Sequence, residues 1–272
     1  MGQFDIKNET IKRAISGFFI VAAIMGSLYL GGYPWFILCS IAALGSLLEF
    51  YRILKGFFHV SKATGFFVGI TILVLSFFHF YNAIVPSLVM GTFFVMLVEI
   101  IRKSASGTSF GIHSLSGTVG GIVYCVFPWS FMIILREHQW GFFILGTLFF
   151  CTWSCDIMAY LVGCNWGKTP LAPNVSPKKT MEGFFGGLAG SLMCAGLLSF
   201  FWQLEPIPLL LIGLLCGTFG QAGDLAESLL KREAGIKDSG NIIPGHGGFL
   251  DRFDSVVVSA TLVYLLWGNL WG

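Results

Sequence analysis

Ionisable side chains are concentrated in one stretch near the C-terminal end of the chain. Residues 228–254 read SLLKREAGIKDSGNIIPGHGGFLDRFD, although the 272-residue sequence is 55% hydrophobic and only 11% charged. Next to it, Asp224, Glu227 and Lys231 recur at i, i+3 and i+7, so one helix face would carry two acids and a base, with Ser228 beside them. The simpler alternative is that the two acids only pair with Lys231. The functional interpretation is a polar cavity that binds a charged ligand.

Two further acids stand at the start of the next expected helix. Asp251 and Asp254 are three residues apart, and acids there would offset the helix macrodipole by about 0.3–1 kcal/mol each. That role does not explain the other ionisable residues around them, which are Lys237, Asp238, His246 and Arg252. Carboxylates from two helices, Asp224 and Asp251, beside lysines are typical of a magnesium site that holds phosphate oxygens.

The loop between these acids is rich in glycine. Gly247 and Gly248 follow Pro244 and Gly245, and glycines permit positive φ and close backbone approach while proline stiffens the turn. This composition predicts a backbone that can wrap around a ligand.

A second polar loop, residues 163–183, reads GCNWGKTPLAPNVSPKKTMEG. Its first part resembles a phosphate-binding P-loop, but the two glycines are one residue too close and a proline follows directly, so we reject that interpretation. The later Ser176, Lys178, Lys179 and Thr180 supply hydroxyl and ammonium groups in a compact turn ahead of a helix, which favours a polyphosphate. Contact of the same loop with anionic lipid is the alternative.

The elements that must position these residues are membrane-spanning helices. Mean hydropathy is +0.80, with 28 Phe and 35 Gly, and apolar runs near the 20 residues or so that a bilayer requires recur along the chain. We expect an all-α polytopic membrane bundle of about nine helices near 11–30, 34–51, 64–81, 83–101, 112–135, 140–163, 182–202, 206–230 and 250–271. Short loops predict a single membrane domain over 1–272, with 1–150 mainly scaffold and 151–272 catalytic.

The basic residues predict the orientation of this bundle. With nine spans, fifteen of the sixteen Lys and Arg residues fall on one side, and Arg136 alone falls on the other. Short loops rich in Lys and Arg lie on the cytoplasmic side of the membrane, so the N-terminus is expected to be cytoplasmic. The first apolar run is expected to be a retained helix, since no small-x-small cleavage site follows it.

The stretch 228–254 resembles the signature of the phosphatidate cytidylyltransferases, also called CDP-diacylglycerol synthases. The matching residues are Ser228, Lys231, Arg232, Lys237, Asp238, Pro244, His246, Gly247, Gly248, Asp251, Arg252 and Asp254. The upstream segments CDIMAYLVG, SPKKTMEGFFGG and GQAGDLAES also resemble that family, so the similarity covers roughly 151–254.

The resemblance implies a magnesium-dependent nucleotidyltransferase of phospholipid biosynthesis, which converts CTP and phosphatidate into CDP-diacylglycerol and pyrophosphate. It implies Asp224 and Asp251 as metal ligands, leaves open a second, monovalent cation, and implies a homodimer with CTP, phosphatidate and membrane lipids but no nucleic acid as partners. The expected catalytic residues are Asp224, Asp251, Lys231, Lys237, Asp238, His246 and Asp254. The expected substrate-binding residues are Ser176, Lys178, Lys179, Thr180, Glu182, Glu227, Ser228, Arg232, Gly247, Gly248 and Arg252.

The expected location is the cytoplasmic (inner) membrane, with the active site at its cytoplasmic face. Two other functions fit part of the pattern. A CTP-dependent lipid or isoprenoid-alcohol kinase would share the nucleotide site but release CDP. A membrane transporter would explain intramembrane acids, of which Asp156 is the best example, although transporters place such acids mid-span on broken helices in repeated halves.

Overall fold

The computed structural model describes residues 3–240 and 247–270, and the side chains of 16–240 and 247–267. These residues form nine continuous helical stretches, which confirms the predicted all-α architecture. In chain order they are α1 (Gln3–Leu30), α2 (Gly32–Ile53), α3 (Lys62–Phe77), α4 (Tyr81–Ser106), α5 to α6 (Gly111–Gly121, then η1 Ile122–Val126, then Phe127–Glu137), α7 (Gly141–Trp166), α8 (Met181–Trp202), α9 to α10 (Pro206–Leu215, then η2 Cys216–Gly220, then Gln221–Glu233) and α11 (Leu250–Leu270).

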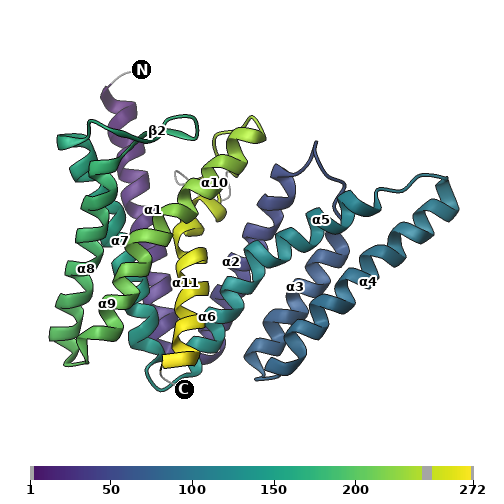
Figure 1. Ribbon diagram of the computed structural model, residues 1–272, viewed down its shortest axis with the longest axis horizontal. Coiled ribbons are helices and arrows are strands. Elements are labelled where there is room, and N and C mark those ends of the chain that lie inside the picture. Colours follow the sequence, from purple (N-terminus) through teal and green to yellow (C-terminus); the bar gives the residue numbers. More distant parts are fainter. Residues whose placement is uncertain (1–2, 241–246, 271–272) are drawn as a thin grey trace. The chain divides into compact units, whose positions relative to one another are not determined.

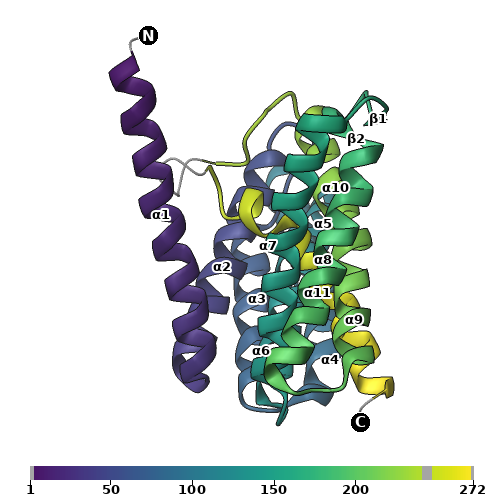
Figure 2. The same ribbon diagram turned by 90° about the vertical axis from the view of Figure 1, so that its left-hand side faces the viewer.

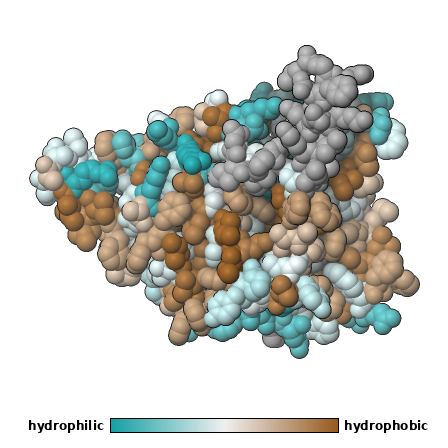
Figure 3. Space-filling model, turned by 180° about the vertical axis from the view of Figure 1, so that it is seen from behind, coloured by the Kyte–Doolittle hydropathy of each residue, from teal (hydrophilic) through white to brown (hydrophobic). Residues whose placement is uncertain are grey.

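The helices have the length and surface of membrane spans. Among the described residues, six stretches are long and apolar enough to cross a bilayer: α2, α4, α5 to α6, α7, α8 and α9 to α10; the apolar part of α1 and α3 are shorter. Large hydrophobic side chains such as Phe200 and Ile112 stand 77% and 82% exposed, and Figure 3 shows many such residues on the face it presents. Lipid is the environment that suits this surface, so the chain is a multi-pass membrane protein.

The chain divides into two compact units. Unit 1 comprises Met1–Ile134 with Asp238–Leu250, and unit 2 comprises Leu135–Lys237 with Asp251–Gly272. The single membrane domain expected from the sequence stays a prediction.

Helix α2 forms the core of unit 1. Its Trp35 and Tyr51 are almost fully buried, and the Tyr51 hydroxyl donates to the Thr118 carbonyl at 2.9 Å. A Cβ at Gly65 or Gly121 would collide with the Tyr51 ring, so these two glycines let α3 and α5 approach α2 closely.

Unit 2 is built on the pair α7 and α8, which lie side by side in both ribbon views (Figures 1 and 2). A Cβ at Gly186 would lie 2.5 Å from Val162, and one at Gly190 would collide with Met158, so the small residues of α8 serve helix packing within the chain. Helix α9 joins this pair through Ser191, whose hydroxyl donates to the Gly213 carbonyl at 2.7 Å.

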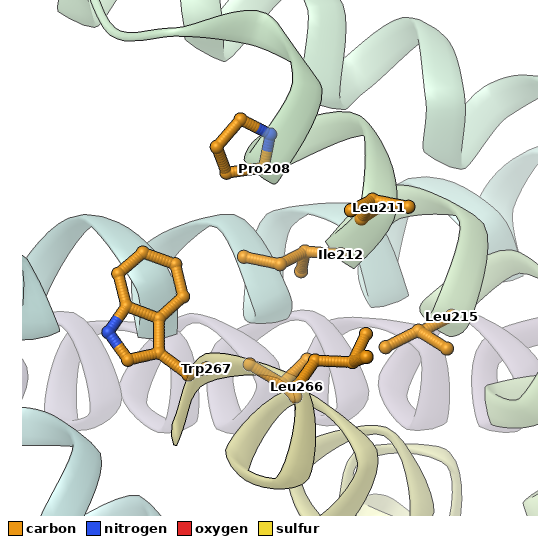
Figure 4. Close-up of a pocket in the computed structure, with 7 residues that line it drawn as sticks. Pro208, Leu211, Ile212, Leu215, Leu266 and Trp267 are labelled. Carbon is orange, nitrogen blue, oxygen red and sulfur yellow. The ribbon is translucent and has the colours of Figure 1, made fainter. Parts of the chain in front are cut away.

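Helices α9 and α11 meet around a narrow apolar pocket, and Figure 4 shows the facing side chains. Seven residues line it: Pro208, Leu211, Ile212, Leu215, Val263, Leu266 and Trp267. The lining holds no charged group, so this pocket offers nothing to a phosphate and belongs to the packing of unit 2.

Between α7 and α8 the chain forms a short hairpin at one end of the pair (Figure 2). Strand β1 (Pro170–Ala172) pairs antiparallel with β2 (Ser176–Thr180), with Pro170 opposite Thr180 and Ala172 opposite Ser176. The sequence predicted only a compact turn for 176–180. The turn is instead made by Pro173, Asn174 and Val175, and the SPKKT segment is the strand that leaves it.

Candidate active site

A cavity of about 380 Å³ opens in unit 2 between the hairpin, α7, α8 and the start of α10. Its polar lining comes from Asp156, Lys178, Lys179, Thr180, Gln221 and Asp224; the remaining lining is Ala159, Tyr160, Gly163, Cys164, Leu171, Gly183 and Phe184. Charged groups of both signs therefore share one cavity with an apolar wall, which suits a ligand that has a phosphate head and a hydrocarbon part.

The hairpin brings its lysines to this cavity because its ends are fixed. Thr180 caps α8 by accepting a hydrogen bond from the Gly183 N–H at 3.1 Å. Glu182 accepts hydrogen bonds from the Lys168 N–H at 3.0 Å and from the Thr169 hydroxyl at 3.0 Å. Glu182, expected to bind substrate, thus holds the loop in front of the hairpin and does not line the cavity.

Lys179 and Asp224 both line the cavity and form an ion pair. The Lys179 ammonium lies 2.5 Å from Asp224 Oδ2, and their side chains are 28% and 33% exposed. The Ser228 hydroxyl reaches Asp224 Oδ1 only at 3.5 Å. We call Lys179 and Asp224 the cavity pair; both side chains are half-buried and line the cavity, although the Lys179 nitrogen itself is covered.

A second charge group lies deeper between α10 and α11. Lys231 lies 2.7 Å from Asp251 Oδ1 and 3.2 Å from Glu227 Oε1. The three side chains are 11%, 6% and 0% exposed, and none of them lines the cavity. We call Glu227, Lys231 and Asp251 the buried triad. In this triad Lys231 forms ion pairs with both acids. The pair of Lys231 with Glu227 confirms that α10 presents these two residues on one face.

The two helices of the buried triad approach each other closely. A Cβ at Gly223 would lie 2.7 Å from the Asp254 carbonyl, so only glycine fits there. Asp254 accepts the Ser255 N–H at 2.6 Å and contacts Glu227. Asp156 on α7 interacts electrostatically with Asp254, Asp224 and Lys179. Asp156 on α7, Asp224 on α10 and Asp254 on α11 thus all interact with Lys179.

The other predicted residues divide between the two units. Arg232 Nε donates to the Val175 carbonyl at 3.3 Å and so joins α10 to the hairpin turn. Lys237, Asp238 and Arg252 are exposed, and Ser176 lies at the start of β2 outside the cavity lining. Asp238, Gly247 and Gly248 belong to unit 1. His246 lies outside the described residues.

Sequence reasoning missed two polar residues of the cavity, Gln221 and Tyr160, and gave Asp156 no role in the proposed reaction. Gln221 lines the cavity one turn before Asp224 and donates to the Gly217 and Phe184 carbonyls at 2.6 and 3.0 Å. Tyr160 lies one turn after Asp156 on α7, so both face the cavity. The 3.6-residue period of the quoted CDIMAYLVG segment could have placed Tyr160 with Asp156, but no sequence signal marks Gln221.

A magnesium ion requires oxygen ligands, and the donor set here fits that requirement in kind. Asp224 and Asp251 each lie against a lysine, and the described residues contain no group of three His, Cys, Asp or Glu side chains close enough to hold a metal. The carboxylates on α7, α10 and α11 are hard oxygen donors, which suit this ion. The lysines paired with Asp224 and Asp251 are the groups that a bound cation would displace.

Comparisons with known proteins agree with the motif. The model of the Cytidylyltransferase family matches residues 11–269. A relative from Synechocystis is 33% identical over 290 aligned residues, which cover 93% of this chain and 94% of the relative. Relatives from Bacillus subtilis and Aquifex aeolicus are 48% and 42% identical over 50% and 52% of this chain, and over 51% and 53% of their own lengths.

All three relatives carry the name phosphatidate cytidylyltransferase. The family match covers nearly the whole chain, and the Synechocystis relative aligns over almost its full length. The chain therefore belongs to the phosphatidate cytidylyltransferase family, as residues 228–254 predicted.

Proposed function

We propose that this protein transfers the cytidylyl group of CTP to phosphatidate, giving CDP-diacylglycerol and pyrophosphate, and that the cavity of unit 2 is the place of reaction. The observation that carries the proposal is the composition of that cavity. Lys178, Lys179 and Asp224 line it together with Tyr160 and Phe184, so a triphosphate and a lipid phosphate have partners beside an apolar wall.

The reaction needs little proton chemistry from the protein. A phosphate monoester has a second pKa of about 6, so the attacking phosphatidate oxygen is already anionic at neutral pH. The protein's task is to align that oxygen with the α-phosphorus of CTP, opposite the departing pyrophosphate, and to offset the charge. Lys178 and Lys179 would hold triphosphate oxygens, because they are the two ammonium groups of the cavity lining.

We include magnesium in the proposal, with Asp224 of the cavity lining and Asp251, which lies against Lys231 outside that lining, as its ligands. When bound, the ion would withdraw negative charge from the phosphate oxygens. Asp224 would then pair with the ion instead of Lys179, and Lys179 would turn to the nucleotide. His246 would position the ligand rather than accept a proton, since the nucleophile is already ionised.

The test is the fate of labelled CTP. Purified protein, phosphatidate and magnesium are incubated with CTP labelled at the α-phosphate, and the lipid fraction is analysed. We expect label in a CDP-lipid and release of pyrophosphate. Transfer of a γ-phosphate label with formation of CDP would instead show a lipid kinase, and no transfer of either label would remove the proposal.

The finer location also belongs to the proposal. The cavity is proposed to face the cytoplasm, because the basic residues sort to the side that carries the hairpin loop, and the proposed membrane is the cytoplasmic (inner) one. Cysteines at Ser176 and at the exposed Asp238 should react with an impermeant thiol reagent only when the cytoplasmic side is open. Labelling of either cysteine in intact cells would show that the orientation is the opposite one. We also include a homodimer in the proposal, and the molecular mass of the purified protein in detergent tests it.

A further inference from the structure

Glu49 places a fully buried carboxylate in the half of the chain that the sequence assigned to scaffold. It lies on α2, one turn before the helix ends, and is 0% exposed. A buried carboxylate is costly unless hydrogen bonds compensate it, so its contacts should explain its presence.

The contacts of Glu49 are with two ends of one segment in unit 1. Its Oε2 accepts the Ser239 hydroxyl at 3.2 Å and the Leu250 N–H at 2.9 Å. The glycines next to these contacts are tightly enclosed: a Cβ at Gly240 would lie 2.6 Å from Glu49 Oε1, and one at Gly248 would collide with Ser239 and Glu49. One carboxylate therefore joins residues 239 and 250, which are eleven positions apart.

A second contact on the same face of α2 strengthens this attachment. Gly45 lies one turn before Glu49, and a Cβ there would be 2.7 Å from the ring of Phe249. The ring of Phe249 thus packs where Gly45 has no side chain, while the next residue, Leu250, donates its N–H to Glu49. Two successive residues are held at two successive turns of α2.

The attachment point is the first residue of α11. The N–H groups of the first helical turn have no partner within the helix, and Glu49 supplies one for Leu250. Asp251 follows in the chain, and Asp251 belongs to the buried triad of unit 2. Glu49 therefore holds the N–H of the residue that directly precedes Asp251 in the chain.

We propose that Glu49 is a positioning residue for the cytidylyl transfer, acting on Asp251 through the residue before it, Leu250. This inference rests on the proposed function. An apolar residue would fill the space at position 49, but it would leave the Ser239 hydroxyl and the Leu250 N–H without their common acceptor.

Three variants separate positioning from bulk stability. Glu49→Leu removes the acceptor and keeps the approximate volume. Glu49→Gln keeps one carbonyl oxygen, which can accept both hydrogen bonds as Oε2 does, but loses the charge. Glu99→Leu is the matched control, since Glu99 is a second buried glutamate of unit 1 that accepts a loop N–H, from Phe110 at 2.8 Å, away from the 239–250 segment.

The readouts are kcat and KM per folded enzyme, with CTP and phosphatidate varied separately. We expect Glu49→Leu to lower kcat about 30- to 100-fold with KM nearly unchanged, as misplacement of a catalytic group does. Glu49→Gln should retain kcat within about 5-fold, and Glu99→Leu within about 3-fold even where it lowers the melting temperature. Hydrogen exchange of the peptide around Leu250 should accelerate in Glu49→Leu but not in Glu99→Leu.

Ser239→Ala provides a test that does not depend on Glu49→Leu folding. It removes one donor and leaves Leu250 to satisfy the carboxylate, and we expect kcat to fall about 3- to 10-fold. The proposal is overturned if Ser239→Ala and folded Glu49→Leu both turn over normally, or if activity falls only in proportion to the folded fraction, as in Glu99→Leu. Absence of CDP-lipid formation by the unmodified protein would instead remove the proposed function.

Discussion

The cavity pair and the buried triad are two solutions to the same problem, a lysine held against carboxylates in unit 2. Lys179 and Asp224 are 28% and 33% exposed, whereas Lys231 and Asp251 are 11% and 6% exposed and Glu227 is fully buried. A pair that is partly open to solvent contributes less to stability and exchanges partners more easily than a buried one. A buried group is costly to break, because the charges left behind have no water to compensate them.

The difference shows that charge spacing alone does not assign roles. The sequence treats Asp224 and Asp251 alike, as two magnesium ligands on two helices. The structure opens Asp224 to the cavity and places Asp251 against Lys231, outside the cavity lining. We infer that the cavity pair meets the ligand first and that the buried triad holds α10 and α11 in register. Four predictions test this division.

The largest effect is expected from Lys231→Met, because it leaves two buried acids without their cation. The folded state should lose about 3–5 kcal/mol, as when one partner of a buried charge group is removed. The thermal midpoint in detergent would measure this loss, and Lys231→Arg, which keeps the charge, should recover part of it. A midpoint equal to that of the unmodified protein would show that the triad does not hold the two helices.

The next effect is on turnover rather than on folding. Asp224→Asn should fold normally and lose at least about 100-fold in kcat, as removal of a major electrostatic contribution to the transition state does. Asp251→Asn should lose a similar amount in kcat and, in addition, thermal stability, because Lys231 then faces one acid less. Both should lose stabilisation by magnesium.

Glu233→Gln is the control for these two variants, since Glu233 is exposed at the end of the same helix α10 and does not line the cavity. It should keep normal kcat and magnesium dependence. If the Asp224 and Asp251 variants behave like Glu233→Gln, the cation is bound elsewhere.

A smaller effect is expected on nucleotide affinity. Lys178→Met and Lys179→Met should each raise the KM for CTP about 10-fold and leave the KM for phosphatidate nearly unchanged. Lys168→Met is the control, because Lys168 belongs to the same loop but its side chain does not line the cavity. Equal changes for both substrates, or a defect in lipid affinity alone, would favour contact with anionic lipid instead.

The smallest effect is expected at Asp254. Asn keeps an oxygen that can accept the Ser255 N–H, so Asp254→Asn should lower kcat only about 10-fold and leave α11 intact. Steady-state kinetics and circular dichroism would measure the two quantities. A loss as large as that of Asp224→Asn would move Asp254 from the helix start into the reaction itself.

The nine helical stretches and one charged helix face were determined by the sequence alone. A bilayer requires apolar runs of fixed length, so composition and spacing locate the helices, although α1 and α4 continue beyond their apolar runs. The helical period places Glu227 and Lys231 on one face without any knowledge of neighbours, and their contact at 3.2 Å confirms it. Local periodicity carries this information because it depends only on residues within two turns.

The partners of these residues were decided by the tertiary structure. The pairing of Lys179 with Asp224 joins positions 45 apart, and the contact of Glu49 with Leu250 joins positions 201 apart. No periodic signal reaches across such separations, because register between helices is set by glycines such as Gly223 that admit a particular neighbour. In the sequence Glu49 is an acid within an apolar span and Gln221 carries no signal at all, and for both only packing shows which residues each one contacts.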